Sequence, residues 1–489
     1  MRSPSPIIPA LLLITTPTYA QGYRQLHSRD DAPSPPIINY PGGGPTVTLP
    51  NYGTIQGTSS TLRAAIAPIN KFLGIPFASP PTRFSPAVPP TPWHPSILNT
   101  TAWKPSCIQQ FVYPEEAQQF AESLFNTPPA EESEDCLYLN VYAPSTPTPA
   151  DGRPVLFWIY GGSLQFGHAG QKLYDGSWFA AYDDVIVVTA NYRTNVFGFP
   201  SSPDLPLTER NLGFLDQRLA LQWVQENIGS FGGSPAKVTL FGESAGAFSI
   251  DALLTSYDAN STPPFRGAIL QSDLYTYRSL PFASSEPSWH TLSDLLGCNN
   301  TTSDEIPCMR AANARTMKRL IETHSLTFDS TPDNHTLVSN PSAKRLSGNV
   351  PRIPLYAGTN AQEGRLFTYN YPNTTATFLK TTAGLTNETL LAALLAAYPH
   401  DDDDETTQTS QIYTDLAFTC PLAKLTADSA ALGIPTWRYY FNASFANTQP
   451  YPGLGVYHTS EIPIVFGTHD GANTTVQQHA LHDAMRGAW

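Results

Sequence analysis

The chain has 489 residues, of which 41% are hydrophobic and only 14% charged, and its formal net charge is −13. An acidic chain without a basic stripe is a poor partner for nucleic acid, and it would not be drawn to anionic membranes. The length and apolar fraction suffice for a large core, but they do not decide between one domain and several.

The first twenty residues have the pattern of a secretory signal peptide. Arg2 supplies a sparse positive charge, residues 7–14 form a short apolar stretch, and residues 18–20 place small residues at the cleavage positions. The apolar stretch is far shorter than the about 20 residues that a membrane-spanning helix needs, and no later segment is long enough. We therefore expect residues 1–20 to be a signal peptide, and the protein to be secreted without a stable membrane span.

Two further features agree with secretion. The N-x-S/T sequons, which suit a secreted glycoprotein, are Asn99, Asn260, Asn299, Asn300, Asn334, Asn373, Asn387, Asn442 and Asn473. The five cysteines include no C-x-x-C pair, which argues against a zinc site and suits disulfides in an oxidising compartment. Spacing alone does not select which cysteines pair.

Residues 21–45 are rich in Pro and Gly and lack periodicity, which predicts an extended arm. From residue 46 onward, short apolar runs alternate with helical stretches such as 215–228. The strand-like runs are 153–160, 184–192, 237–241, 266–270, 352–358 and 436–441. Because these runs lack polar alternation, we expect strands buried on both faces. The alternation predicts an α/β domain over residues 46–489, with helices flanking a mostly parallel sheet.

The stretch "LFGESAGAFS", residues 240–249, places Ser244 between a strand-like run and a helical run. A G-x-S-x-G match is weak by itself, since a serine in an ordinary turn also produces it. A sharp strand-to-helix turn, however, crowds the backbone, and Gly242 and Gly246 would relieve that crowding. Such a turn presents the serine oxygen at a helix N-terminus, where the N–H of Ala245 can stabilise negative charge. We therefore interpret Ser244 as a nucleophile.

A serine nucleophile needs a histidine base and an orienting carboxylate, which follow in the order Ser, acid, His in α/β-hydrolases. The downstream histidines are His400, His458, His469, His479 and His482. His458 follows glycines in a loop, where a base could face a cleft, whereas His479 and His482 are interpreted as helix-surface residues rather than a metal pair. Glu363 lies just past the strand-like run 352–358, where catalytic groups of such sheets gather, although it could also be an exposed loop carboxylate.

The stretch around Ser244 resembles the nucleophile elbow of the type-B carboxylesterase/lipase family, which includes cholinesterases and secreted fungal lipases. Further similar blocks occur in the family's order at residues 133–144, 155–167, 191–200, 211–246, 357–364 and 455–467. The resemblance covers roughly residues 46–489 and is closest in character to secreted fungal carboxylesterases and lipases. It implies an α/β-hydrolase fold with helical cap insertions, in which Ser244 is the nucleophile, Glu363 the acid and His458 the base.

The resemblance also implies an oxyanion hole made of the backbone N–H groups of Gly162, Ser163 and Ala245. Ser163 stands where the family has a third glycine. Since only its N–H is needed, the role survives if Ser163 can adopt the required backbone conformation. Glu243, beside the nucleophile, is expected to be structural rather than catalytic.

The resemblance implies disulfides Cys107–Cys136 and Cys298–Cys308, which leave Cys420 unpaired. The first of these loops is similar in position to the flap over the active-site gorge of family lipases. Arg83 and Glu134 match an ion pair that has a structural role in the family.

The implied reaction is hydrolysis of a small-molecule or lipid ester through an acyl-enzyme, with no metal or organic cofactor. Activity should fall in acid as His458 protonates, near the ordinary histidine pKa of about 6.5. One alternative is a non-catalytic cholinesterase-like binding or adhesion protein, but such relatives typically lose the nucleophile. A peptidase is disfavoured because the family blocks point to esters. A cholinesterase needs an aromatic choline site, and residues 107–136 contain no Trp.

The chain stops at Trp489, 31 residues after His458. Family members usually continue past a similar stretch with further helices. Residues 483–489 resemble the start of such a helix, with no Gly or Asn cap after it. We therefore expect an incomplete C-terminus that leaves apolar surface uncovered beside the histidine loop.

Overall fold

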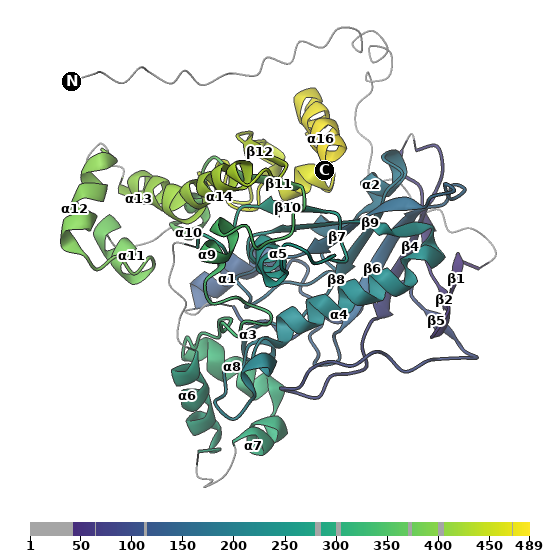
Figure 1. The fold of residues 1–489 in the computed structure, drawn as a ribbon, viewed down its shortest axis with the longest axis horizontal. Helices are drawn as coiled ribbons and strands as arrows, with labels where there is room; N and C mark the ends of the chain where they lie inside the picture. Colours follow the sequence, from purple (N-terminus) through teal and green to yellow (C-terminus); the bar gives the residue numbers. More distant parts are fainter. Residues whose placement is uncertain are drawn as a thin grey trace.

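The computed structural model describes residues 43–63, 65–111, 115–278, 285–299, 305–369, 374–399, 405–471 and 473–489. The predicted signal peptide and nearly all of the predicted arm lie outside these residues. Helices gather around one twisted sheet, and two further groups of helices project from it (Figure 1).

The large sheet has nine strands in the order β12-β11-β10-β9-β7-β8-β6-β4-β3. In chain order they are β3 (Thr58–Ser60), β4 (Ile69–Pro76), β6 (Tyr138–Pro144), β7 (Arg153–Ile159), β8 (Ile186–Ala190), β9 (Gly233–Glu243), β10 (Gly267–Gln271), β11 (Leu355–Asn360) and β12 (Thr436–Phe441). All pairs from β8 to β12 are parallel, and the pairs that join β8, β6, β4 and β3 are antiparallel. The predicted mostly parallel sheet is therefore confirmed. A small second sheet contains β1 (Thr46–Leu49), β2 (Gly53–Gln56) and β5 (Ile97–Asn99).

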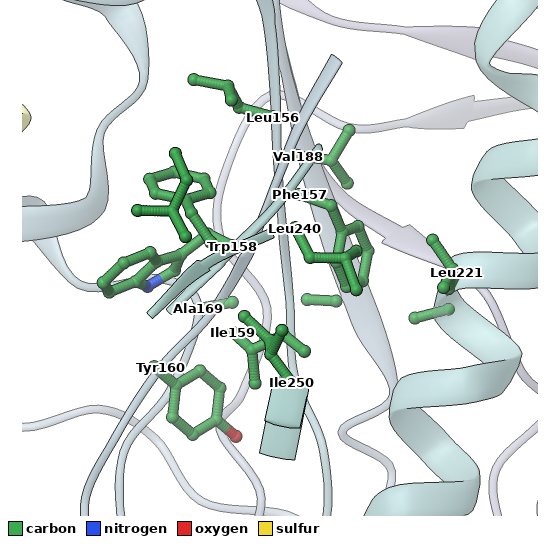
Figure 2. Close-up of a cluster of buried hydrophobic side chains, with 14 of the residues drawn as sticks. Leu156, Phe157, Trp158, Ile159, Tyr160, Ala169, Val188, Leu221, Leu240 and Ile250 are labelled. Atoms are coloured by element: carbon green, nitrogen blue, oxygen red, sulfur yellow. The ribbon is translucent and has the colours of Figure 1, made fainter. Parts of the chain in front are cut away.

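Helices cover the sheet and bury its central strands. The helices that contact its strands are α2 (Ser177–Tyr182), α4 (Leu212–Asn227), α5 (Ala245–Ser256) and α14 (Cys420–Ala431). Helices that pack mainly on other helices are α3 (Asn195–Gly198), α9 (Pro341–Leu346), α10 (Gly364–Phe367), α15 (Ile462–Val465) and α16 (Val476–Ala488). In Figure 2 the side chains of Phe157 and Leu240 point from the sheet toward Leu221 of α4, and all three are buried. Each such side chain contributes about 1.5–3 kcal/mol through burial, so the central strands anchor the fold.

Strand β12 departs from the expectation of burial on both faces. It lies at the edge of the sheet and has only β11 as a neighbour within the described chain. Trp437 and Tyr440 are 60% and 58% exposed. A run of aromatic residues suits an edge strand as well as a central one, so its sequence could not predict this position.

Two helical groups are inserted between strands in the second half of the chain. One, between β10 and β11, contains α6 (Glu286–Leu296), α7 (Ile306–Ala311) and α8 (Ala314–Thr323). The other, between β11 and β12, contains α11 (Thr375–Thr381), α12 (Glu388–Ala397) and α13 (Glu405–Thr414). The first group packs in an apolar cluster around Trp289 and Met309, which also includes Phe84 and Phe197 from the first half of the chain. The second group has a cluster around Phe378 and Ile412. These groups are the predicted helical cap insertions.

Two disulfides and one ion pair link loops in the described chain. One disulfide and the ion pair lie in its first half, and the other disulfide lies in the helical group between β10 and β11. Cys107 is bonded to Cys136, and Cys298 is bonded to Cys308. The loop closed by the first bond carries α1 (Glu115–Phe125). Beside this bond, Arg83 donates two hydrogen bonds to Glu134, at 2.7 and 2.6 Å. Cys420 is a free, exposed cysteine.

The last helix corrects the interpretation of residues 483–489. They complete α16 and do not begin a helix, because α16 starts after Thr475, whose side chain accepts the N–H of Gln478. Trp489 then packs against Tyr356 and Tyr439, with ring centroids 5.0 Å from each. The expectation of an incomplete C-terminus stays a prediction. In the described part of the chain, no helix has both the length and the apolar character needed to cross a membrane.

Candidate active site

Ser244 occupies a strained turn between β9 and α5. Its φ and ψ are 53° and −127°, a conformation that non-glycine residues rarely adopt and that costs about 1–3 kcal/mol. Its N–H donates to the carbonyl of Gln271 at 2.8 Å, and its carbonyl accepts the N–H of Phe248 at 2.9 Å. Hydrogen bonds on both sides therefore hold this turn at the carboxyl end of β9.

The flanking glycines make the turn possible because the backbone of β7 passes close by. A Cβ on Gly246 would lie 1.9 Å from the carbonyl oxygen of Ile159, and a Cβ on Gly242 would lie 2.7 Å from the same oxygen. Both distances are shorter than real contacts of this kind. The crowded strand-to-helix turn expected from the sequence is therefore present around Ser244.

Glu363 and His458 are brought together by two loops at the carboxyl ends of β11 and β12. Glu363 Oε2 lies 2.7 Å from His458 Nδ1, and both side chains are buried. The loops are tied by two hydrogen bonds, from Gln362 N–H to the Val456 carbonyl at 3.0 Å and from Val456 N–H to Gln362 Oε1 at 2.9 Å. This contact orients the imidazole so that its other nitrogen, Nε2, faces away from Glu363.

The other nitrogen of His458 lies at the nucleophile turn. Nε2 is 3.1 Å from Oε1 of Glu243, the residue that directly precedes Ser244. Both atoms are buried, and neither makes a hydrogen bond of suitable geometry within the described structure. The hydrogen bond expected from Ser244 Oγ to Nε2 is therefore not formed in this structure, and the catalytic roles of the three residues stay a prediction. The sequence indicated a structural role for Glu243, whereas the structure places its carboxylate against the candidate base.

The surrounding carboxylates perturb the titration of His458. Burial lowers the pKa of the imidazole, but Glu243, Glu363 and Glu461 more than offset this effect and raise the pKa to about 9. Burial raises the pKa of Glu243 well above its ordinary value, although the adjacent His458 opposes this rise. The site therefore favours a protonated imidazole more than an isolated histidine would.

The loop after β7 brings the candidate oxyanion donors to the same turn. A Cβ on Gly161 would lie 2.8 Å from the Cβ of Ser244, so this loop touches the nucleophile turn directly. Gly162 and Ser163 have φ values of 103° and 54°. Ser163 thus has a positive φ, which a glycine adopts more readily, and its side chain is exposed. Together with Ala245 at the start of α5, these residues remain the predicted oxyanion donors.

Aromatic side chains that the sequence did not single out surround the acid–base pair. The rings of Phe367 and Phe418 lie 5.1 and 5.0 Å from the imidazole of His458. Near the flap, Phe120 of α1 stacks on Tyr369 at 5.0 Å and contacts Tyr451 at 5.0 Å. Phe367 and Phe418 thus give the imidazole an apolar surrounding. No local pattern in the sequence distinguishes these two rings from ordinary core residues.

The remaining histidines do not join the site. His400 lies outside the described residues. His479 is exposed, as expected, but the prediction that His482 lies on the helix surface is wrong. His482 is buried, with Nδ1 2.7 Å from the carbonyl oxygen of Ile464, and burial lowers its pKa to about 4. Within the described residues, no cluster of three or more His, Cys, Asp or Glu side chains is arranged to hold a metal ion.

Comparison with known proteins identifies the family. The model of the carboxylesterase family matches residues 43–489. Carboxylesterase 1C of Rattus norvegicus is 32% identical over 88% of this chain and 82% of its own length. Acetylcholinesterase of Bungarus fasciatus is 34% identical over 89% of this chain and 76% of its own. Para-nitrobenzyl esterase of Bacillus subtilis (strain 168) is 34% identical over 91% of this chain and 88% of its own. The resemblance seen in the sequence is thereby confirmed: the chain belongs to the carboxylesterase family of α/β-hydrolases and is a carboxylic ester hydrolase.

Proposed function

We propose that this protein is a secreted serine esterase that acts through Ser244, Glu363 and His458 and forms an acyl-enzyme. The observation that carries the proposal is the buried 2.7 Å contact between Glu363 and His458 Nδ1, which leaves Nε2 without a hydrogen bond at the strained turn of Ser244. A buried nitrogen that makes no hydrogen bond is costly in an inert protein, but a catalytic base must keep it available.

The proposed reaction has two steps. In the first, His458 Nε2 removes the proton of Ser244 Oγ while the oxygen attacks the ester carbonyl, and the N–H groups of Gly162, Ser163 and Ala245 stabilise the oxyanion. His458 then donates that proton to the departing alcohol. In the second step, His458 takes a proton from water as the water oxygen attacks the acyl-enzyme carbonyl, and His458 then returns that proton to Ser244 Oγ as the free acid leaves. The carboxylate of Glu363 stabilises the imidazolium throughout.

The substrate class is inferred from the side chains near His458 and from the composition of the flap. Phe367 and Phe418 place apolar rings beside His458, and residues 107–136 provide no Trp for a choline group. An uncharged ester of a small molecule or lipid fits these surroundings better than a choline ester. The similarity to an enzyme named para-nitrobenzyl esterase makes para-nitrophenyl esters suitable first probes.

Secretion is the other part of the proposal. The apolar segment before residue 20, the sequons and the two disulfides all agree with an oxidising extracellular environment. A role as a non-catalytic adhesion protein is disfavoured, because the nucleophile, acid and base are all retained.

The decisive experiment is hydrolysis of para-nitrophenyl esters of increasing acyl length by the purified chain. Ser244→Ala should reduce turnover to near background, while Ser256→Ala, at the end of the same helix, should leave it unchanged. The acyl-enzyme should appear as a burst of para-nitrophenol equal to the enzyme concentration. Full turnover by Ser244→Ala would refute the proposed nucleophile.

A further inference from the structure

A chain of hydrogen bonds, buried beyond its first member, runs from Trp489 toward the proposed catalytic acid. The indole N–H of Trp489 donates to Gln271 Oε1 at 2.9 Å, and Gln271 Nε2 donates to Glu461 Oε1 at 3.0 Å. Gln271 and Glu461 are fully buried. Because three distant segments of the chain supply these groups, their alignment depends on the completed fold.

The chain continues from Glu461 to the catalytic acid through Asn360. Asn360 Nδ2 donates to Glu461 Oε2 at 2.6 Å and to the Tyr457 carbonyl at 2.9 Å. The backbone N–H of Asn360 donates to Glu363 Oε1 at 2.6 Å, and Glu363 Oε2 contacts His458. Asn360 therefore joins the loop of the acid to the loop of the base.

Gln271 also touches the other half of the site. Its backbone carbonyl accepts the N–H of Ser244 at 2.8 Å, whereas its side chain supports Glu461. One residue at the end of β10 thus contacts both the nucleophile turn and the network behind the acid–base pair.

The orientation of the Gln271 amide is fixed by chemistry. An amide oxygen and an amide nitrogen are similar in size, so a rotated amide would fit the same space. Rotation would turn Oε1 toward the carboxylate of Glu461 and leave two acceptors facing each other. The indole N–H of Trp489 is only a donor, so it requires an oxygen opposite it and thereby directs Nε2 to Glu461.

We propose that Gln271 is a positioning residue that holds the nucleophile turn in register with the Glu363–His458 pair, and that the indole N–H of Trp489 selects the effective orientation of its amide. This inference rests on the proposed function, because it assumes that Ser244, Glu363 and His458 react together. Its consequence is that a single N–H group at the end of α16 influences turnover without touching the substrate.

The inference predicts a change in the pH profile. The acidic groups that interact with His458 are Glu243, Glu363, Glu461 and Asp273. If Glu461 loses the Gln271 donor, its carboxylate is less well solvated and protonates more readily. A neutral Glu461 raises the pKa of His458 less, so the acid limb of kcat/KM should move to lower pH.

The test compares Trp489→Phe with Trp437→Phe. Both substitutions remove one indole, but Trp437 lies exposed on β12 and has no part in the network. The phenyl ring introduced by Trp489→Phe would still pack against Tyr356 and Tyr439, so this variant removes the N–H and keeps an aromatic contact. We expect Trp489→Phe to lower kcat about tenfold with little change in KM, and to shift the acid limb. Trp437→Phe should match the wild type in both.

Gln271→Met, which keeps the backbone carbonyl but removes the amide, should reproduce the loss of kcat and the shift. If it fails to fold, Trp489→Phe still decides. Unchanged kcat and an unchanged pH profile in Trp489→Phe would overturn the inference, even if its Tm fell, because only packing would then have been lost. Ser244→Ala is measured in parallel: an active Ser244→Ala refutes the proposed function, whereas an inactive Ser244→Ala with a silent Trp489→Phe refutes this inference alone.

Discussion

The carboxylate of Glu243 lies 3.1 Å from Nε2 of His458, the nitrogen that is proposed to accept the proton of Ser244. Glu363 holds the other nitrogen at 2.7 Å, so the imidazole is placed between two carboxylates in a buried site. Such an arrangement stabilises the imidazolium that forms in the transition state, but it also stabilises the imidazolium of the resting enzyme. The balance between these effects determines the pH at which the enzyme works.

The acid limb of kcat/KM should therefore lie above pH 6.5, toward the His458 pKa of about 9. The imidazole is protonated below its pKa and cannot act as a base, so kcat/KM should rise with pH until His458 is neutral. This replaces the value near 6.5 expected from the sequence. Glu243→Gln should move the limb to lower pH, because the Glu243 carboxylate, when ionised, is one of the groups that raise the pKa of His458, although burial raises the pKa of Glu243 itself.

Steady-state kinetics from pH 5 to 10 with an uncharged ester test this prediction. Glu226→Gln, on the outer side of α4, is a suitable control because it removes a carboxylate far from the site. A wild-type limb at 6.5 that Glu243→Gln does not move would show that Glu243 exerts no effective charge on His458.

Gly246, two residues after Ser244, should not tolerate a side chain. In Gly246→Ala the new Cβ would meet the carbonyl oxygen of Ile159 at 1.9 Å, which forces β7 and α5 apart. We expect a loss of at least about 3 kcal/mol of stability together with loss of activity. In the control Gly229→Ala, no described atom lies within 4 Å of the new Cβ, so the free energy of unfolding should change by no more than about 0.5 kcal/mol. Equal Tm values for the two variants would contradict the close approach of the two backbones.

The parts of the site that could be predicted from the sequence are those encoded by contiguous residues. The glycines on either side of Ser244 mark a crowded turn, and Glu363 follows an apolar run that ends at the carboxyl edge of the sheet. Likewise, the apolar runs predicted the central strands, because burial on both faces excludes polar alternation.

The supporting network could not be predicted in this way. Gln271 and Glu461 are 190 residues apart in the sequence, and Gln271 and Trp489 are 218 residues apart. Each is a common residue type in an ordinary local setting, so only the folded chain shows that they meet. The exposure of β12 has a similar explanation, since the order of strands in a sheet depends on contacts that a local pattern does not contain.

Phe120 should anchor the flap between Cys107 and Cys136. Within α1 no residue is buried, and the contacts of Phe120 with Tyr369 and Tyr451 supplement the contact of Phe125 with Phe166 at its C-terminal end. Phe120→Ala should make this segment more susceptible to proteolysis and raise KM a few-fold, with kcat little changed because Ser244 and His458 keep their surroundings. Limited proteolysis and kinetics measure both effects. Gln119→Ala, at the adjacent exposed position, is the control, and equal cleavage of the two variants would count against an anchoring role.

In the described part of the chain, β12 forms an edge of the large sheet, and this edge should promote self-association. An edge strand presents unpaired backbone groups, and here Trp437 and Tyr440 add an exposed aromatic ring to each face of the strand. We expect the average mass measured by light scattering to rise with protein concentration, and Trp437→Lys to reduce this rise, because a charge at the edge opposes strand pairing. Turnover should be unchanged. Val88→Lys is the matched control, since Val88 is equally exposed, at 60%, and the same charge is added to an acidic protein. If both lysine variants reduce association to the same extent, net charge rather than the β12 edge is responsible, and the edge is not the contact surface.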